Sequence, residues 1–120
     1  MASRIFLASF LISMIAYSTD VFAGFFETGN SLYSDCEGED FKKFKCFGYV
    51  VGAYDMHAFM AAAIKRSGGK QVICGPDGLT VGQMRDVVVK YLKDNPDKRH
   101  HPASILAFAA FADAWPCPNN

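Results

Sequence analysis

Apolar side chains recur at three- and four-residue intervals through most of the chain, which is the period of an amphipathic helix. The longest run extends from about Phe41 or Lys45 to about Arg66, and Ser67-Gly68-Gly69 stops it. Its apolar face is formed by Phe47, Val50, Val51, Tyr54, Ala58, Ala61 and Ala62. We predict one long helix here.

A shorter segment, Leu79 to Asp94, carries the clearest local helix signal. Thr80 is a natural N-cap, and Gln83 three residues later completes a capping box, in which each side chain bonds the other residue's backbone N–H. Asn95-Pro96 ends the helix, because the residue before a proline disfavours helical geometry. The side chains predicted to be buried are Val81, Met84, Val88, Tyr91 and Leu92.

Two further helices complete the pattern. Asn30 to Cys36 is predicted to form a short helix, and His101-Pro102 opens a last helix, Ala103 to Trp115, which Pro116 terminates. This last segment is apolar almost all round, so we expect it to be the most central helix. No segment shows sustained two-residue alternation, and the sequence therefore predicts a small all-α bundle of about four helices.

The first 23 residues have the pattern of a secretory signal peptide. Arg4 gives a positive start, and Ile5 to Tyr17 is an apolar run too short to span a bilayer. Val21-Phe22-Ala23 then provides small residues before the cleavage point. We predict cleavage after Ala23, with an uncleaved membrane anchor as the alternative. Residues 24–120 would then form one exported domain.

Charge and cysteine content narrow the range of functions. Twelve basic and twelve acidic residues give zero formal net charge without a basic run, which argues against nucleic-acid binding. Four cysteines in an exported chain predict two disulfides, with three possible pairings. The spacing of the cysteines and histidines does not fit a zinc site, so we expect no metal and no cofactor.

Candidate catalytic residues are few and poorly arranged. Asp55 and His57 are two positions apart and point to different faces of a helix, so we expect Asp55 to make a polar contact at an interface. An even number of cysteines leaves no free thiol for nucleophilic catalysis. Of His100 and His101, we expect one to cap the last helix and the other to face solvent or a partner. The sequence thus predicts a binding protein rather than an enzyme.

Two glycines interrupt the long helix. Gly48 and Gly52 are four residues apart and share one helix face. A glycine in a helix interior costs about 1 kcal/mol against alanine, and it is tolerated where another backbone must come close. We therefore expect a tight helix crossing at these glycines. Tyr49 and Tyr54 supply large side chains whose hydroxyls need partners, and we expect them in the core or on a dimer face.

Four motifs occur in order along the chain: GNSLYSDC, CFGYVVGAYD, CGPDGLTVGQMRDVVVKYLKDNPDKRHHPA and a closing WPC. Together they resemble the Tai family of immunity proteins, also called resistance-associated proteins, of Gram-negative type VI secretion systems. The resemblance covers nearly all of residues 24–120, and the ordered set is more specific than any single motif. The positions that match the family pattern are Cys46, Gly48, Tyr49, Gly52, Asp55, Cys74, Pro76, Gln83, Val87, Val88, Leu92, Pro96, Trp115, Pro116 and Cys117.

The resemblance implies inhibition by binding. Members of this family neutralise peptidoglycan amidases, which are Cys-His hydrolases that neighbouring bacteria inject into the periplasm. They block the substrate cleft, commonly as homodimers that hold two effector molecules. The resemblance therefore implies a periplasmic protein with an amidase effector as partner and no membrane association after signal cleavage. The alternative is a periplasmic helical protein of chaperone-like or structural type, similar in size and class to the acid-stress chaperones.

Residues that block a cleft are expected on a protruding polar turn. The segment from Asp94 to His101 is the best candidate, and the turn from Gly75 to Gly78 is the second. The alternative for the first segment is an ordinary solvated turn between helices. The candidate partner-binding residues are Asp94, Asn95, Asp97, Lys98, Arg99, His100 and His101.

The order of the helices also bears on the disulfides. If the helices run up and down, Cys36 and Cys46 flank one short connection. Cys74, after the long helix, and Cys117, after the last helix, then meet at the opposite end of the bundle. The topology therefore favours the pairs Cys36–Cys46 and Cys74–Cys117 over the other two pairings.

Overall fold

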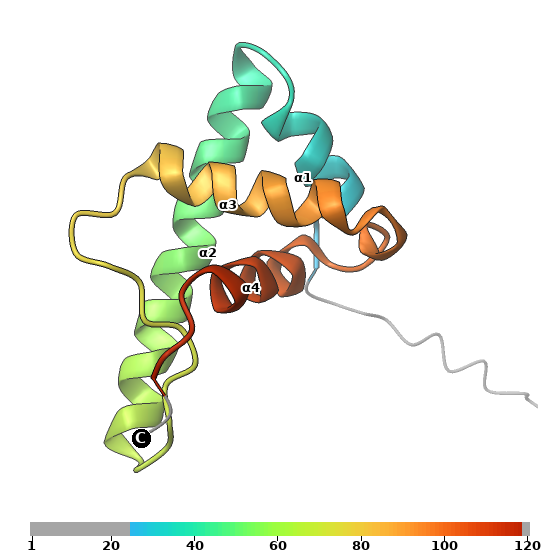
Figure 1. The fold of residues 1–120 in the computed structure, drawn as a ribbon. Helices are drawn as coiled ribbons and strands as arrows, with labels where there is room; N and C mark the ends of the chain where they lie inside the picture. The colour runs from blue at the N-terminus through green and yellow to red at the C-terminus, as the bar shows by residue number, and fades with distance from the viewer. Residues whose placement is uncertain (1–24, 119–120) are drawn as a thin grey trace, which may run out of the picture.

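The computed structural model describes residues 25–118 as a helical domain (Figure 1). In chain order its elements are α1 (Gly29–Cys36), α2 (Phe41–Arg66), α3 (Val81–Asp94), the 3₁₀ helix η1 (Pro96–Lys98) and α4 (Ala103–Ala114). Within these residues the only β-type pairings are two isolated bridges, so the prediction of a small all-α bundle is confirmed. The signal peptide predicted at residues 1–23 lies outside the described residues.

Local capping signals determine where α1 and α3 begin. Thr80 accepts a hydrogen bond from the backbone N–H of Gln83 at 3.2 Å, and Gln83 accepts one from the N–H of Thr80 at 2.9 Å. A second capping box, formed by Thr28 and Ser31, starts α1 one residue earlier than predicted. These side chains satisfy N–H groups that lack partners in the first helical turn. The short η1 turn was not predicted.

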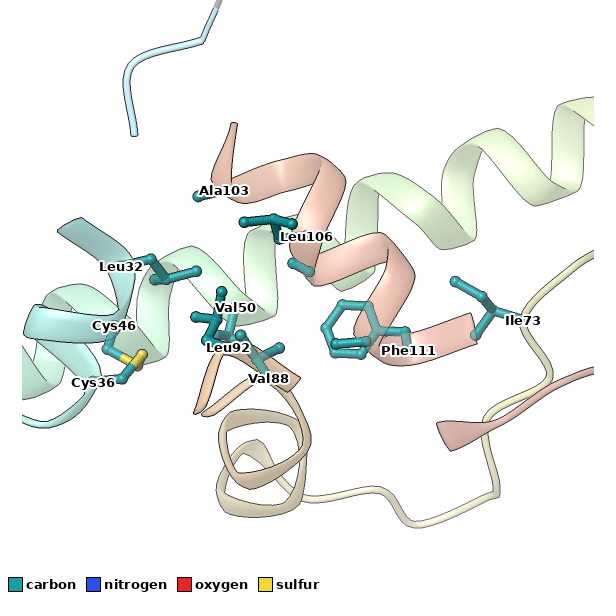
Figure 2. Close-up of a cluster of buried hydrophobic side chains, with 12 residues drawn as sticks. Leu32, Cys36, Cys46, Val50, Ile73, Val88, Leu92, Ala103, Leu106 and Phe111 are labelled. Atoms are coloured by element: carbon teal, nitrogen blue, oxygen red, sulfur yellow. A yellow bond between two sulfur atoms is a disulfide. The ribbon is translucent and has the colours of Figure 1, made fainter. Parts of the chain in front are cut away.

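The hydrophobic core lies where α3 and α4 cross α2, as the close-up of the buried side chains shows (Figure 2). Helix α4 contributes Ala103, Leu106, Ala107, Ala110 and Phe111 to this core, more than any other helix. It also packs against each of the other three α-helices. The prediction that this helix is the central one is confirmed.

Helix α2 buries much less of its length than its sequence predicts. Only Cys46, Val50 and Ala61 are buried in this helix of 26 residues, and Ala58 and Ala62 of the predicted apolar face are exposed. A helix of this length spans about 39 Å, and α4 with its 12 residues spans about 18 Å. The shorter helices therefore cover only part of α2. Helix α1 lies beside its N-terminal part, and its C-terminal end extends beyond α3 and α4 (Figure 1).

Two disulfides close the fold at separate places. One joins Cys36 at the end of α1 to Cys46 in α2, and the other joins Cys74 to Cys117. Beside the second, Cys74 donates a backbone hydrogen bond to the carbonyl of Trp115 at 2.8 Å, and Cys117 donates one to Val72 at 3.1 Å. These are the two pairs that the up-and-down topology favours.

Candidate binding surfaces

The polar segment between α3 and α4 is a rigid turn that rests on the start of α1. The carbonyl of Arg99 accepts a hydrogen bond from the N–H of Asn30 at 2.8 Å, and that of His101 accepts one from Gly29 at 2.9 Å. Both donors belong to the first turn of α1, whose N–H groups have no partner within the helix. The backbone of the turn therefore replaces water as the cap of α1, and this holds the turn in place.

Two of the seven predicted partner-binding residues instead support the turn. Arg99 donates a hydrogen bond from Nε to the carbonyl of Leu92 at 2.6 Å, and its guanidinium carbon lies 4.0 Å from the ring centroid of Tyr33. Asn95 donates from its side chain to the carbonyl of Tyr91 at 2.8 Å. Both side chains are half-buried, so they position the turn rather than project from it.

The other five predicted residues are exposed: Asp94, Asp97, Lys98, His100 and His101. The two imidazole rings lie side by side with centroids 4.1 Å apart. The prediction that one histidine caps α4 is wrong, because Pro102 occupies the N-cap position and no side chain caps the helix. The first free N–H of α4, that of Ala103, instead donates to the carbonyl of Glu27 at 2.8 Å.

The second predicted turn, Gly75 to Gly78, is anchored by a different contact. A Cβ atom added at Gly75 would collide with the hydroxyl of Tyr54. That tyrosine packs edge-on against Phe111, with ring centroids 5.2 Å apart, as expected for a core residue. Pro76 is exposed, and Gly78 has a positive φ of 73°, which glycine adopts without strain. The turn therefore presents little more than backbone and Asp77 to solvent.

Gly48 and Gly52 lie on an open face of α2. Among residues 25–118, a Cβ atom added at either position would meet nothing within 4 Å, so these residues do not make the predicted helix crossing at the glycines. Next to them a groove of about 620 Å³ runs between α2, the segment at Val72 and Phe108 of α4. Sequence reasoning missed this surface, although exposed apolar residues at helical spacing opposite the core face were its signal.

The polar groups near this groove are few. His57 is half-buried, and its Nε2 atom has no hydrogen-bond partner among the described residues. Burial lowers the pKa of its imidazole, and a hydrogen bond with the backbone of Ile73 acts in the opposite direction. Burial raises the pKa of the Tyr49 hydroxyl, and a hydrogen bond with Ser104 acts in the opposite direction. Asp55 is exposed on the outer side of α2, and the ion pairs of the described residues do not include it.

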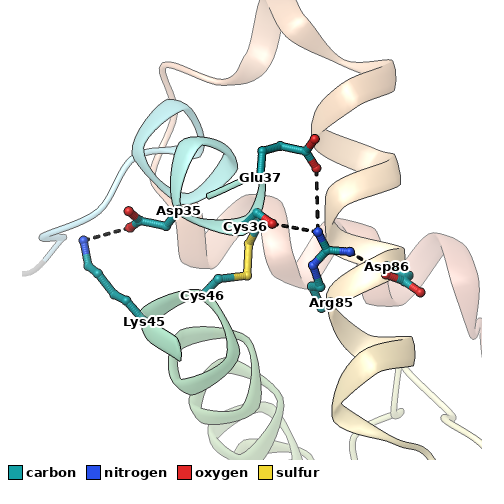
Figure 3. Close-up of a disulfide and its surroundings, with 7 residues drawn as sticks. All are labelled: Asp35, Cys36, Glu37, Lys45, Cys46, Arg85 and Asp86. Carbon is teal, nitrogen blue, oxygen red and sulfur yellow. Dashed lines mark hydrogen bonds and ion pairs between the residues drawn. A yellow bond between two sulfur atoms is a disulfide. The ribbon is translucent and has the colours of Figure 1, made fainter. Parts of the chain in front are cut away.

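A charged cluster around the first disulfide fixes α1 to its neighbours (Figure 3). Lys45 bridges Glu27 at 2.6 Å and Asp35 at 2.9 Å, and its hydrogen bond with Glu27 is the main cause that raises the pKa of the lysine to about 12. The same hydrogen bond lowers the pKa of Glu27. On the other side of the disulfide, Arg85 donates to the carbonyl of Cys36 at 2.7 Å. These contacts hold α1 against α2 and α3.

The described residues thus combine a disulfide-linked helical scaffold with two exposed surfaces, one polar and one apolar. Among them, no cluster of three metal-ligating side chains occurs, and all four cysteines are in disulfides. No helix in this part of the chain is long and apolar enough to cross a membrane. The described residues thus form a small, disulfide-linked all-α domain.

A profile of the Rap1a immunity proteins matches residues 28–117, and the chain belongs to this family. The match spans every helix of the domain and both disulfides. Comparisons with curated proteins and with solved structures gave no match. The family assigns the chain an immunity role, which requires binding to an effector.

Proposed function

We propose that this protein is exported to the periplasm and neutralises a type VI secretion effector, a peptidoglycan amidase, by occupying its substrate cleft. Membership of the Rap1a immunity family supports the immunity role. The ordered motifs from GNSLYSDC to WPC support the amidase class, because they resemble the Tai proteins. The protein then acts without catalysis or cofactor, since blocking a cleft requires only a stable complex.

The observation that carries the occlusion model is the rigid turn between α3 and α4. Its exposed side chains project from a backbone that is held by α1 and by the buried contacts of Arg99. A binding segment that is already ordered loses little conformational entropy when it enters a cleft. The turn therefore offers a preformed insert, with Lys98 and the two adjacent imidazoles as its polar contacts.

We also propose that the active form is a homodimer. The resemblance to the Tai proteins motivates this assignment, and the open apolar face of α2 is compatible with it. Each protomer would carry its own polar turn, so one dimer would bind two amidase molecules.

Charge reversal in the turn tests the occlusion model. The Lys98→Glu/His100→Glu variant is expected to bind the exported Cys-His amidase encoded by an adjacent gene about 100-fold more weakly, because truncated or reversed charges at an interface cost several kcal/mol. Lys42→Glu/Lys43→Glu, on exposed positions of α2, is the matched control and is expected to bind normally. Isothermal titration calorimetry measures both.

The outcomes separate the two parts of the proposal. Equal affinity of the turn variant and the control variant would remove the turn from the interface. Absence of binding by the unaltered protein would contradict the amidase assignment itself.

The exposed apolar surface also favours a second candidate, a chaperone-like protein. Phe41, Phe44 and Phe59 are between 68% and 78% exposed, and such surfaces bind unfolded chains. A chaperone would suppress aggregation of many unrelated clients at a few-fold molar excess. An immunity protein would leave their aggregation unchanged and bind one effector selectively, so a light-scattering assay with unrelated clients distinguishes the two.

A further inference from the structure

The side of α2 that faces away from the core carries an apolar stripe, and Asp55 is an exposed charged residue on the same face. Its members follow one another at intervals of three or four residues, which places them on one helix face. We call this set the outer stripe: Phe41, Phe44, Gly48, Gly52, Met56 and Phe59. Phe41 is 78%, Phe44 72%, Met56 60% and Phe59 68% exposed. The buried Cys46 and Val50 lie on the opposite side of the same helix.

The centre of the outer stripe has the shape that a second helix requires. Gly48 and Gly52 lower helix propensity, and within the protomer no contact compensates, because the space above both is open. A pair of glycines one turn apart lets another helix approach to a short interaxial distance, with the larger aromatic side chains packing on either side. No helix of the described residues fills this space, which leaves room for a helix of another molecule.

We propose that the outer stripe pairs with the outer stripe of a second copy of this chain, with the two α2 helices antiparallel and crossing at Gly48 and Gly52. A two-fold axis midway between the glycines brings Gly48 of one copy to the level of Gly52 in the other. The same axis brings Phe41 to the level of Phe59. This inference rests on the homodimer proposed above and assigns its interface and register.

The charges at the ends of α2 favour the antiparallel arrangement. Lys65 and Arg66 end the helix, and at its start Glu39 and Asp40 are followed by Lys42 and Lys43 of the first turn. Parallel helices would bring the basic ends of both copies together, at a cost from like-charge repulsion and from aligned helix dipoles. Antiparallel helices separate the Lys65-Arg66 ends of the two copies by most of the helix length and oppose the two helix dipoles.

The apolar area is sufficient for a stable interface. The four large side chains of the outer stripe, taken over two copies, would bury on the order of 1,000 Å², which is the lower bound for a specific interface. The adjoining groove beside Met56 and Met60 adds further apolar surface. The polar turn lies between α3 and α4 and contributes no residue to the outer stripe.

Glycine replacement gives a test in which folding is preserved. In Gly48→Gln/Gly52→Gln both new side chains enter open space in the protomer, so the helix content measured by circular dichroism is expected to stay the same. The dimer dissociation constant, measured by sedimentation equilibrium on the exported protein, is expected to rise about 100-fold, because the side chains block the crossing. Gly82→Gln, at an exposed glycine of α3, is the matched control and should leave the dimer intact.

Two of these measurements can overturn the proposed interface. A monomeric unaltered protein, or a dimer that survives Gly48→Gln/Gly52→Gln, would overturn the inference. Oxidative cross-linking of Phe41→Cys chains with Phe59→Cys chains supports the antiparallel register, and efficient self-cross-linking of Phe41→Cys alone would overturn it. The readout is independent of the amidase. A dimer that survives Gly48→Gln/Gly52→Gln while the unaltered protein binds the amidase rejects this inference alone. A dimer that is lost in this variant while the unaltered protein does not bind the amidase rejects the proposed amidase inhibition alone.

Discussion

Gly29 lies where the start of α1 meets the turn before α4, and its lack of a side chain allows this contact. A Cβ atom there would lie 2.8 Å from the carbonyl oxygen and 2.9 Å from the Cα of Arg99, and it would also collide with Leu106. Because two of these atoms belong to backbone, they cannot move aside as a flexible side chain does. The glycine of the GNSLYSDC motif is therefore a packing requirement.

Gly29→Ala is expected to lower the free energy of unfolding by about 1–3 kcal/mol, the usual cost of overpacking a close contact. Gly82→Ala is the matched control, since its Cβ would meet only one atom, at 3.9 Å, and alanine improves helix propensity. Urea unfolding followed by circular dichroism measures both. Equal or greater stability of Gly29→Ala would show that α1 and the turn do not pack in this way.

At the scale of single residues, the sequence predicts those contacts whose two partners lie within a few positions of each other along the chain. The capping box of Thr80 and Gln83 was predicted and is present, because both partners lie within one helical turn. The roles of Arg99 and the two histidines were not predictable. They depend on Leu92, Tyr33 and the start of α1, which come together only in the folded chain.

At the scale of elements, the two disulfides differ in how accessible they are. Cys36 is 1% and Cys46 0% exposed, and their bond lies in the core. Cys74 is exposed and Cys117 half-buried, in the segment that pairs residues 72–74 with residues 115–117. Thiol–disulfide exchange requires that the attacking thiolate reach a sulfur atom, so access decides which bond opens first.

Mild reduction of the native protein is expected to open Cys74–Cys117 at least roughly tenfold faster than Cys36–Cys46. Opening it releases a constraint between residues 43 apart, which lowers stability by about 4 kcal/mol in the chain-entropy estimate. Alkylation at intervals followed by peptide mapping measures the order. Simultaneous labelling of all four cysteines, or a peptide joining Cys36 to Cys74 or Cys117, would contradict the assignment.

Helix bounds were predicted within a residue or two, apart from the alternative start of α2 at Lys45, which is four residues late, but the burial of α2 was not predicted. Periodicity shows that a helix has an apolar face without showing which face meets the core when two are apolar. In α2 the face at Val50 is buried and the face at Phe41 and Phe59 is exposed, although both follow the same spacing. The choice depends on where α3 and α4 cross, which is a tertiary property.

At the scale of the whole molecule, the fold separates two surfaces with different chemistry. The polar turn is tied to α1 and α4, and the outer stripe runs along the exposed side of α2. In the complex that we propose, one surface joins two copies and the other meets the effector. Neither role requires a catalytic group, in keeping with the membership of an immunity family.

The central claim is that the protein inhibits an amidase by covering its cleft. Its most direct test is a titration of an exported type VI Cys-His amidase with the protein, with release of cleaved peptidoglycan peptides as the readout. Occlusion predicts that activity falls linearly to an end point at one protomer per amidase molecule. Undiminished peptide release at a several-fold excess of the protein would contradict the claim.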